Sequence, residues 1–335
     1  MGGMGTVWCI LDRADHQVKA AKILRQSDAA SLLRFVREQS MRIDHSHVVT
    51  PQSWAGMDDR VLFTMPLVRG GSVSHLLKTY GVLPLRWTAL LVDQTLQALE
   101  AVHAAGIIHR DVKPANLLLE PTGRGMPHLR LTDFGIAIPL DEPRMTRTSM
   151  IVGSPGYMAP EQWRGADPDE RADLYSVGRV GIQMLTGLRP PAEDSDVDLT
   201  EHRTGDEPHE ALLDLLDRAV SRDPLGRPES AAAMRAELLA LDLTSRPPEP
   251  GESIMVADAF ADLATIGGST PATASMTATV GATGHPTGLT GGPPLDATRV
   301  QHGAAVAARR SPVPGVVLLL VGVLSIIAAL MLLLA

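Results

Sequence analysis

Residues 109–116 read His-Arg-Asp-Val-Lys-Pro-Ala-Asn, and residues 133–135 read Asp-Phe-Gly. Together they hold the side chains that a phosphoryl-transfer site needs, because a protein supplies that reaction mainly with positioning and charge neutralisation. Asp111 is a carboxylate that can accept the proton of an attacking hydroxyl. Asn116 and Asp133 supply the oxygen ligands that Mg²⁺ prefers. The pattern therefore predicts a metal-dependent phosphoryl-transfer site.

The chain between these two stretches indicates how they meet. Two short apolar runs, 117–119 and 129–131, lie on either side of a turn at 123–125. Such runs separated by a glycine-containing turn are typical of an antiparallel hairpin. We expect the hairpin to bring Asn116 and Asp133 together at its open end.

Apolar patterns change from strand-like to helix-like along the chain. Short apolar runs predict strands at 6–11, 18–24 and 61–65. Apolar residues at spacings of three and four, preceded by Pro84 and followed by Gly106, predict a helix across 85–99. Similar helical patterns recur at 173–185, 210–220 and 231–241. Strands followed by helices predict an α+β fold with two lobes, a small β-rich one and a larger α-rich one.

The catalytic motifs resemble those of the protein kinase family. Residues 109–116 resemble the catalytic loop, and Asp-Phe-Gly resembles the magnesium motif. Ala-Pro-Glu at 159–161 is similar to the element that closes the activation segment. The resemblance extends over nearly all of residues 1–243 and is greatest to bacterial, eukaryotic-like, membrane-anchored serine/threonine kinases. It implies a two-lobed kinase fold, use of ATP with Mg²⁺ or, as the alternative ion, Mn²⁺, and protein substrates with Ser or Thr acceptors.

The first residues resemble the end of a glycine-rich loop. Gly2, Gly3, Gly5 and Val7 match the part of that loop that covers the ATP phosphates, where glycine permits close backbone approach. The first glycine of the family pattern would precede Met1, and so would the first strand of the N-terminal lobe. Either the natural start lies upstream, or the nucleotide roof lacks one edge and ATP affinity suffers.

Further nucleotide contacts are implied by the resemblance alone. Lys22 matches the strand lysine that holds the α- and β-phosphates, and Glu38 is the candidate for its ion-pair partner. Met65 would be the gatekeeper of the hinge. The carbonyl of Pro66 and the amide of Val68 would face adenine, and proline suits a position that needs only its carbonyl. Without the resemblance, a lysine in a strand is more often a solvated edge residue.

Through Lys113, the resemblance implies specificity for Ser and Thr acceptors. In kinases that this chain resembles, a lysine two residues after the catalytic aspartate, here Asp111, accompanies hydroxyl acceptors on Ser and Thr. Ser154, in a Gly-Ser-Pro-Gly-Tyr stretch, resembles the residue that bridges these two side chains. Asp173 resembles an aspartate that braces the catalytic loop, and Arg227 resembles the partner of Glu161.

Arg110 suggests regulation by phosphorylation. Kinases with arginine before the catalytic aspartate are often switched by a phosphate on the activation loop, which guanidinium groups bind well. The candidate sites are Thr146, Thr148 and Ser149, of which we favour the two threonines. The alternative is an unmodified polar loop.

The C-terminal part has a different composition. Residues 244–314 are rich in Pro, Gly and Thr, and predict a disordered juxtamembrane linker. The run 316–335 has no charged residue, and as a helix it is long enough to cross the roughly 30 Å core of a bilayer. We therefore predict a transmembrane helix at 315–335. Arg309 and Arg310 precede it, so the kinase domain is expected in the cytoplasm with a single C-terminal anchor in the cell membrane.

The overall composition limits the partners. The 335-residue chain has a formal net charge of -8, so we expect no nucleic-acid partner. Its single cysteine, Cys9, excludes an intrachain disulfide and fits a reducing compartment. Ser325 and Ala329 have the small-residue spacing of paired membrane helices; chance in such a composition is the favoured explanation, and a homodimer is the alternative. Two alternatives to a protein kinase stay open: a pseudokinase that acts as a membrane-tethered binding module, and a small-molecule phosphotransferase.

Overall fold

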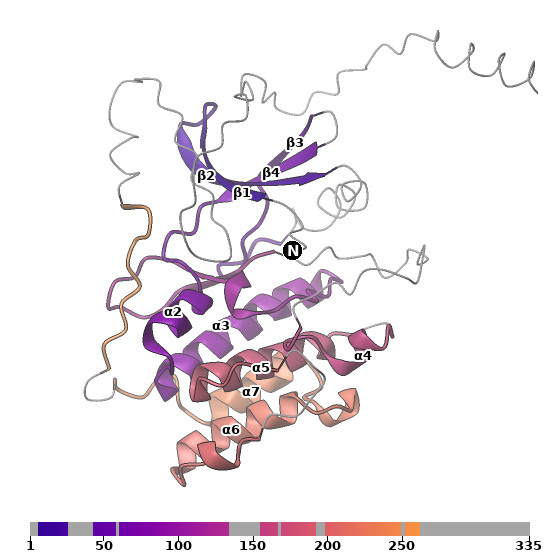
Figure 1. The fold of residues 1–335 in the computed structure, drawn as a ribbon, viewed down its shortest axis with the longest axis vertical. Helices are drawn as coiled ribbons and strands as arrows, with labels where there is room; N and C mark the ends of the chain where they lie inside the picture. Colours follow the sequence, from indigo (N-terminus) through magenta and orange to yellow (C-terminus); the bar gives the residue numbers. More distant parts are fainter. Residues whose placement is uncertain are drawn as a thin grey trace, which may run out of the picture. The chain divides into compact units, whose positions relative to one another are not determined.

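The computed structural model describes residues 6–25, 43–57, 60–133, 155–166, 169–191, 198–248 and 252–261. All of them belong to one compact unit, Met1–Thr287. Figure 1 shows a β-sheet followed by a group of helices. The strands are β1 (Thr6–Asp12), β2 (Gln17–Arg25), β3 (Ser53–Met57), β4 (Arg60–Pro66), β5 (Leu117–Leu119) and β6 (Leu129–Leu131). The helices are α2 (Val73–Tyr80), α3 (Leu85–Ala104), α4 (Pro160–Trp163), α5 (Arg171–Thr186), α6 (Glu207–Ala219) and α7 (Ala231–Ala240).

The first sheet has the strand order β1-β2-β4-β3, and every neighbouring pair is antiparallel. Its inner strand β2 places Lys22 between Val7 of β1 and Phe63 of β4. Val61 and Phe63, two positions apart on β4, are buried in the main core, so one face of the sheet is apolar and packs on that core. The three strands predicted from apolar runs are confirmed.

The helical part is built around α3. Leu91, Leu96 and Leu99 are fully buried on this helix, which packs against α5, α7 and β6. Pro84 precedes the helix and Gly106 follows it with φ of 73°, the usual asymmetry of helix ends. The four long helices predicted from periodicity, now α3, α5, α6 and α7, are confirmed with small shifts at their ends.

Helix α5 is buried on nearly every side. A Cβ atom at Gly178 would lie 2.9 Å from the carbonyl oxygen of Leu216 on α6, so glycine is needed for this close approach. The close packing fixes α5, and with it Asp173 near the start of that helix, against the rest of the domain.

The hairpin between the two catalytic motifs forms as expected. Leu117 pairs with Leu131, and Leu119 pairs with Leu129, in the antiparallel ladder of β5 and β6. All four side chains are buried in the main core. The apolar contacts anchor the hairpin, so its open end holds the adjoining residues 116 and 132 in a fixed position.

Residues 252–261 depart from the prediction of disorder. Ile254 and Val256 are buried in the main core, and Val256 pairs with Gly123 in the β5–β6 turn. The prediction that a disordered linker begins at Thr244 is therefore wrong for this segment, which buried aliphatic side chains, backbone hydrogen bonds and ion pairs dock on the domain. Residues 249–251 and 262–314 of the predicted linker, and the predicted membrane segment 315–335, lie outside the described residues. Within the described ranges, no helix is both long and apolar enough to cross a membrane.

Candidate active site

Two side chains of the catalytic loop hold Asp111 in place. The Lys113 ammonium donates to Asp111 Oδ2 at 2.7 Å, and the Asn116 amide donates to the same oxygen at 3.0 Å. Asn116 also donates to the backbone carbonyl of Asp111 at 2.8 Å. The Asp111 side chain keeps 16% of its surface exposed, so it is oriented by the loop and still open to a substrate. A carboxylate held in this way can act as a general base.

Asp133 lies next to this loop because of the β5–β6 hairpin. The amide of Thr132 donates to the carbonyl of Asn116 at 3.0 Å, directly beyond the pair Leu117 and Leu131. The predicted convergence of Asn116 and Asp133 is confirmed. Asp133 has φ of 57°, a left-handed conformation that is uncommon for a residue other than glycine and often found at functional sites.

Lys22 connects the first sheet to this region. Its ammonium lies 2.8 Å from Asp133 Oδ1, and the two side chains are 20% and 35% exposed. The ion pair joins residues 111 positions apart. Glu38, the predicted partner of Lys22, lies outside the described residues, so this pairing stays a prediction. The structure thus places the candidate phosphate-binding lysine and the candidate metal ligand side by side.

The oxygen atoms of Asn116 and Asp133 fit a divalent ion. The side-chain nitrogen of Asn116 donates to Asp111. The side-chain carbonyl oxygen of Asn116 therefore points away from Asp111, where it can bind a metal ion. Asp133 contributes a partly exposed carboxylate. In the part of the chain that the structure describes, no three His, Cys, Asp or Glu side chains form a metal cluster. Mg²⁺ typically needs only one or two protein carboxylates when nucleotide phosphates complete its shell.

A buried carboxylate braces the catalytic loop from behind. Asp173 is fully buried and accepts hydrogen bonds from the backbone amides of His109 at 2.8 Å and Arg110 at 2.7 Å. His103 on α3 lies 2.8 Å from the same carboxylate. Burial raises the pKa of Asp173, but the hydrogen bonds and the neighbouring histidines outweigh it, so the pKa is lowered overall. The predicted bracing role of Asp173 is confirmed, and it holds Arg110 at φ of 65°.

His103 and His109 belong to this support, although the sequence assigned neither a role. His109 is fully buried, and its Nε2 atom lies 3.1 Å from the carbonyl of Thr132, which links the catalytic loop to the residue before Asp133. Burial lowers the pKa of His109 more than the nearby carboxylates raise it. His103 lies near the C-terminal end of a long apolar helix, where only its contact with Asp173 reveals its function.

The predicted ion pair between Glu161 and Arg227 is also confirmed. The guanidinium contacts both carboxylate oxygens, at 2.6 and 2.8 Å, and its side chain is fully buried. Arg227 also donates to the carbonyl of Ser221 and stacks on the Tyr175 ring at 5.0 Å from its centroid. This bidentate pair fixes the start of α4 against the segment that follows α6.

The structure describes only some of the other predicted site residues. Met65 lies opposite Ala20 at the end of β4, Pro66 lies opposite Lys19, and Val68 is buried in the connection from β4 to α2. These positions fit a hinge segment, and their contacts with adenine stay predictions. The remaining candidates lie outside the described residues: Gly2, Gly3, Gly5, Thr146, Thr148, Ser149 and Ser154.

Comparisons with known proteins agree with this geometry. A family model described as "Protein kinase domain" matches residues 1–248. The serine/threonine-protein kinase pkn3 of Myxococcus xanthus is 36% identical over 267 residues, which cover 73% of this chain and 49% of that protein. The serine/threonine-protein kinase PknA of Mycobacterium tuberculosis is 32% identical over 269 residues, covering 75% of this chain and 62% of that protein. PknA of Corynebacterium glutamicum is 32% identical over 306 residues, covering 86% and 62%. The chain therefore spans about half to three-fifths of the length of these relatives.

Proposed function

This chain belongs to the protein kinase family, and on that premise we propose that it transfers the γ-phosphate of ATP to Ser and Thr hydroxyls of proteins. One observation carries the proposal: Lys22, Asn116 and Asp133 come from separate segments and converge beside Asp111. Membership of the family implies use of ATP and a divalent metal ion. An intact set of this kind also argues against the pseudokinase alternative.

The roles of the residues follow from their contacts. Asp111 orients the acceptor hydroxyl and takes its proton as the hydroxyl attacks, because its carboxylate is fixed by Lys113 and Asn116. Lys113 also places a positive charge where the transferred group arrives. Lys22, in contact with Asp133, is positioned to pair with nucleotide phosphates. Asn116 and Asp133 would hold the metal, which we propose is Mg²⁺, with Mn²⁺ as a substitute. The bound ion would supply charge neutralisation of the phosphates.

Two observations support the preference for Ser and Thr over Tyr. Lys113 contacts Asp111 directly, as expected of a kinase for aliphatic hydroxyls. The relatives from Myxococcus and Mycobacterium are named as serine/threonine-protein kinases. Autophosphorylation at Thr146 or Thr148 is part of this proposal, and mapping the phosphorylated residues after incubation with Mg-ATP tests it.

We further propose that the chain is anchored in the cell membrane by residues 316–335, with the kinase domain in the cytoplasm. The uncharged run and the preceding Arg309 and Arg310 support this topology. A homodimer through the same segment stays a prediction. Alkaline extraction of membranes tests the anchor: the full chain should stay in the pellet, whereas a peripheral protein would be released.

The catalytic proposal is tested by transfer of radiolabelled phosphate from ATP to a generic protein substrate. Asp111→Asn should lower kcat by about 10³-fold, the contribution typical of a general base, while nucleotide affinity stays within about twofold. Asp217→Asn, at an exposed position on α6, is the matched control and should leave kcat unchanged. Nucleotide binding without any transfer by the wild-type chain would support the pseudokinase alternative. Transfer to small alcohols but not to proteins would support the small-molecule alternative.

A further inference from the structure

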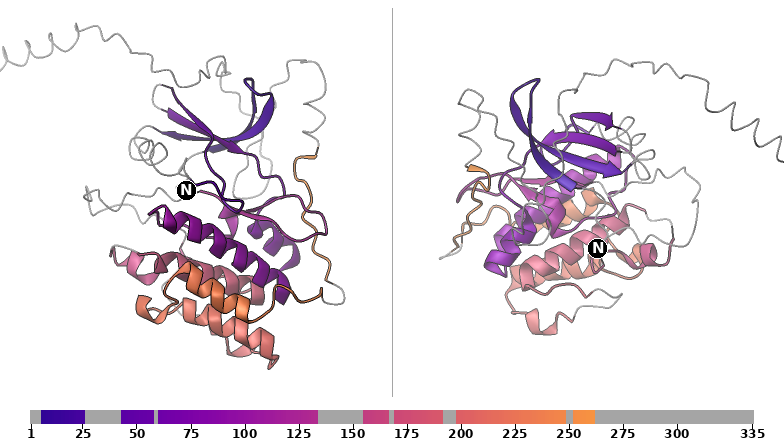
Figure 2. Two further views of the ribbon diagram at one scale, coloured as in Figure 1. Left: turned by 180° about the vertical axis from the view of Figure 1, so that it is seen from behind. Right: turned by 45° about the horizontal axis from the view of Figure 1, so that its top comes forward.

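Residues 252–261 lie on the helical part as an extended peptide. Ile254 and Val256 are 5% and 1% exposed, whereas the side chains of Ser253, Met255 and Ala257 face solvent. Alternate burial is the pattern of a strand that docks one face on a surface. The segment runs along the edge of the domain opposite α4 in both views from front and back (Figures 1 and 2). Its surroundings, which we call the docking groove, are α2, the start of α3, the β5–β6 turn and residues 69–70.

An isolated antiparallel bridge and two further backbone amide donors hold the segment. Val256 and Gly123 exchange two bonds, N–H to carbonyl, at 2.8 and 3.0 Å. The amide of Ala259 donates to the carbonyl of Arg69 at 2.8 Å, and the amide of Met255 donates to the hydroxyl of Tyr80 at 3.0 Å. Main-chain pairing of this kind binds peptides largely independently of their sequence, and side-chain pockets then supply specificity.

The pocket for Val256 is shaped by Gly70. A Cβ atom at Gly70 would lie 2.5 Å from the carbonyl oxygen of Leu119 and 2.6 Å from Val256 Cγ1. Gly70 also donates its amide to that carbonyl at 2.7 Å. The missing side chain of Gly70 therefore leaves the space that the valine methyl group fills, and the groove selects an aliphatic residue at this position.

Opposite charges meet at the two ends of the groove. Glu252 lies 3.6 Å from Arg86 at the start of α3, and the two side chains are 4% and 14% exposed. Asp258 lies 2.9 Å from Arg69, which also donates to the carbonyl of Phe260. The groove is thus basic at both ends, and the segment is acidic at both ends.

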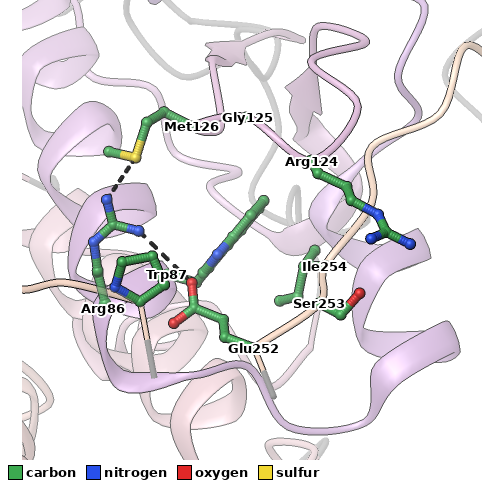
Figure 3. A pocket seen from close by; sticks show the side chains of 9 residues that line it. Arg86, Trp87, Arg124, Gly125, Met126, Glu252, Ser253 and Ile254 are labelled. Atoms are coloured by element: carbon green, nitrogen blue, oxygen red, sulfur yellow. Dashed lines mark hydrogen bonds and ion pairs between the residues drawn. The ribbon is translucent and has the colours of Figure 1, made fainter. Parts of the chain in front are cut away.

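A cavity remains beside the first of these ion pairs. It has a volume of about 360 Å³ and is lined by Arg86, Trp87, Arg124, Met126, Ser253 and Ile254 among others. Figure 3 shows the Arg86 guanidinium between Glu252 and the Met126 sulfur, with the Arg124 guanidinium on the far side of Ile254. The segment therefore leaves part of the groove unfilled at this end.

We propose that this groove is a docking site for extended peptides of the pattern acidic–x–aliphatic–x–aliphatic–x–acidic. Glu252, Ile254, Val256 and Asp258 give the chain's own segment that pattern, and this segment is the occupant. It is held as an exchangeable ligand would be, because alternate side chains, main-chain hydrogen bonds and two end charges make its contacts, with only Ile254 and Val256 reaching the core. A protein segment with the same pattern competes for the groove. The proposal rests on these contacts and does not depend on phosphoryl transfer.

The test uses the full-length chain and a fluorescein-labelled synthetic peptide of residues 250–261. Val256→Asp in the chain should release the segment and open the groove, so the labelled peptide binds at least about tenfold more tightly than it binds the wild-type chain, as expected when a tethered competitor is removed. Met255→Asp changes the exposed neighbour on the same strand and should leave the affinity at the wild-type value. A labelled peptide that carries the same Val256→Asp change should bind neither chain. Fluorescence anisotropy measures all of these affinities.

A charge exchange provides the second arm. Glu252→Arg in the chain should also raise the affinity for the wild-type peptide, and Arg86→Glu added to it should restore the competing segment and lower the affinity again. This arm decides the matter if Val256→Asp impairs folding, because both changes lie at the end of the segment and leave the Val256 contact with the core unchanged. Equal peptide affinity for wild-type, Val256→Asp and Glu252→Arg chains would overturn the proposal. The assay contains no ATP and no metal, so its failure is separate from a failure of the proposed kinase activity.

Discussion

The catalytic loop at 109–116 and the segment at 252–261 both lie against the helical part of the domain, yet different interactions hold them. The loop is fixed by buried polar groups, above all the carboxylate of Asp173. The segment is fixed by two aliphatic side chains and by ion pairs at its ends. Changing one member of a buried polar network costs much of its stabilising free energy. Weakening an apolar docking contact costs free energy in proportion to the apolar surface that becomes exposed. The difference predicts how each region responds to substitution.

The largest effect is expected on the polar side of this comparison. Asp173→Asn replaces a carboxylate oxygen that accepts two buried hydrogen bonds by an amide that donates, and we expect a loss of about 3 kcal/mol in the free energy of unfolding. Because the pKa of Asp173 is lowered in the folded protein, the stabilisation is present above the unfolded value near 4 and is lost as pH falls through the folded pKa. Urea unfolding at pH 7 and pH 3 measures both. A difference from wild type that is unchanged at pH 3 would contradict this linkage.

A smaller effect is expected at Gly70 on the apolar side. Gly70→Ala places a methyl group against the backbone of Leu119 and against Val256, so we expect a loss of about 2 kcal/mol in unfolding free energy. The matched control is Gly106→Ala. No atom lies near a Cβ at Gly106, and its left-handed conformation costs about 1 kcal/mol without any steric clash. Equal losses in the two variants would show that the segment does not press on residue 70.

The lowered pKa values of two buried histidines predict that stability also depends on pH. Burial lowers the pKa of both His47 and His109. The unfolded chain then binds protons near pH 6.5 while the folded chain does not, so stability falls as pH decreases below that value. Between pH 6.5 and 5.5 each histidine should cost at most about 1 kcal/mol of unfolding free energy. His47→Gln should reduce the slope of the unfolding free energy against pH. An unchanged slope would mean that His47 has the same pKa in the folded and unfolded chain.

The smallest effect is expected at the solvent side of the segment. Met255→Asp changes an exposed side chain, so the unfolding free energy should stay within about 0.5 kcal/mol of wild type. Thermal unfolding monitored by circular dichroism measures it. A loss as large as that of Gly70→Ala would mean that the outer face of the segment is covered by another part of the chain.

The sequence predicted the catalytic loop and its neighbours well, because each side chain there has a fixed chemical task. Asp111 and Asn116 need their functional groups, and the β5–β6 hairpin follows from four buried leucines. The contact between Lys22 and Asp133 was not predicted as a pair, since it joins segments that only the fold brings together.

Shorter elements escaped prediction because they carry too little pattern. Strand β3 reads Ser-Trp-Ala-Gly-Met, which is short and contains glycine, and α2 covers only about two turns after Gly71 and Ser72. Residues 252–261 were hidden by the Pro- and Thr-rich composition around them. Ile254 and Val256 are too few in such a stretch to form a recognisable apolar pattern, although their burial helps to dock the segment.

The attachment of Asp258 to Arg69 fixes the point from which the remaining chain departs. Arg69 follows Val68 in the connection between β4 and α2, so the described segment ends beside the joint between sheet and helices. A dye coupled at residue 261, which is exposed, would therefore lie beside that joint. Helix α4 lies at the opposite edge of the domain, away from such a label (Figure 1).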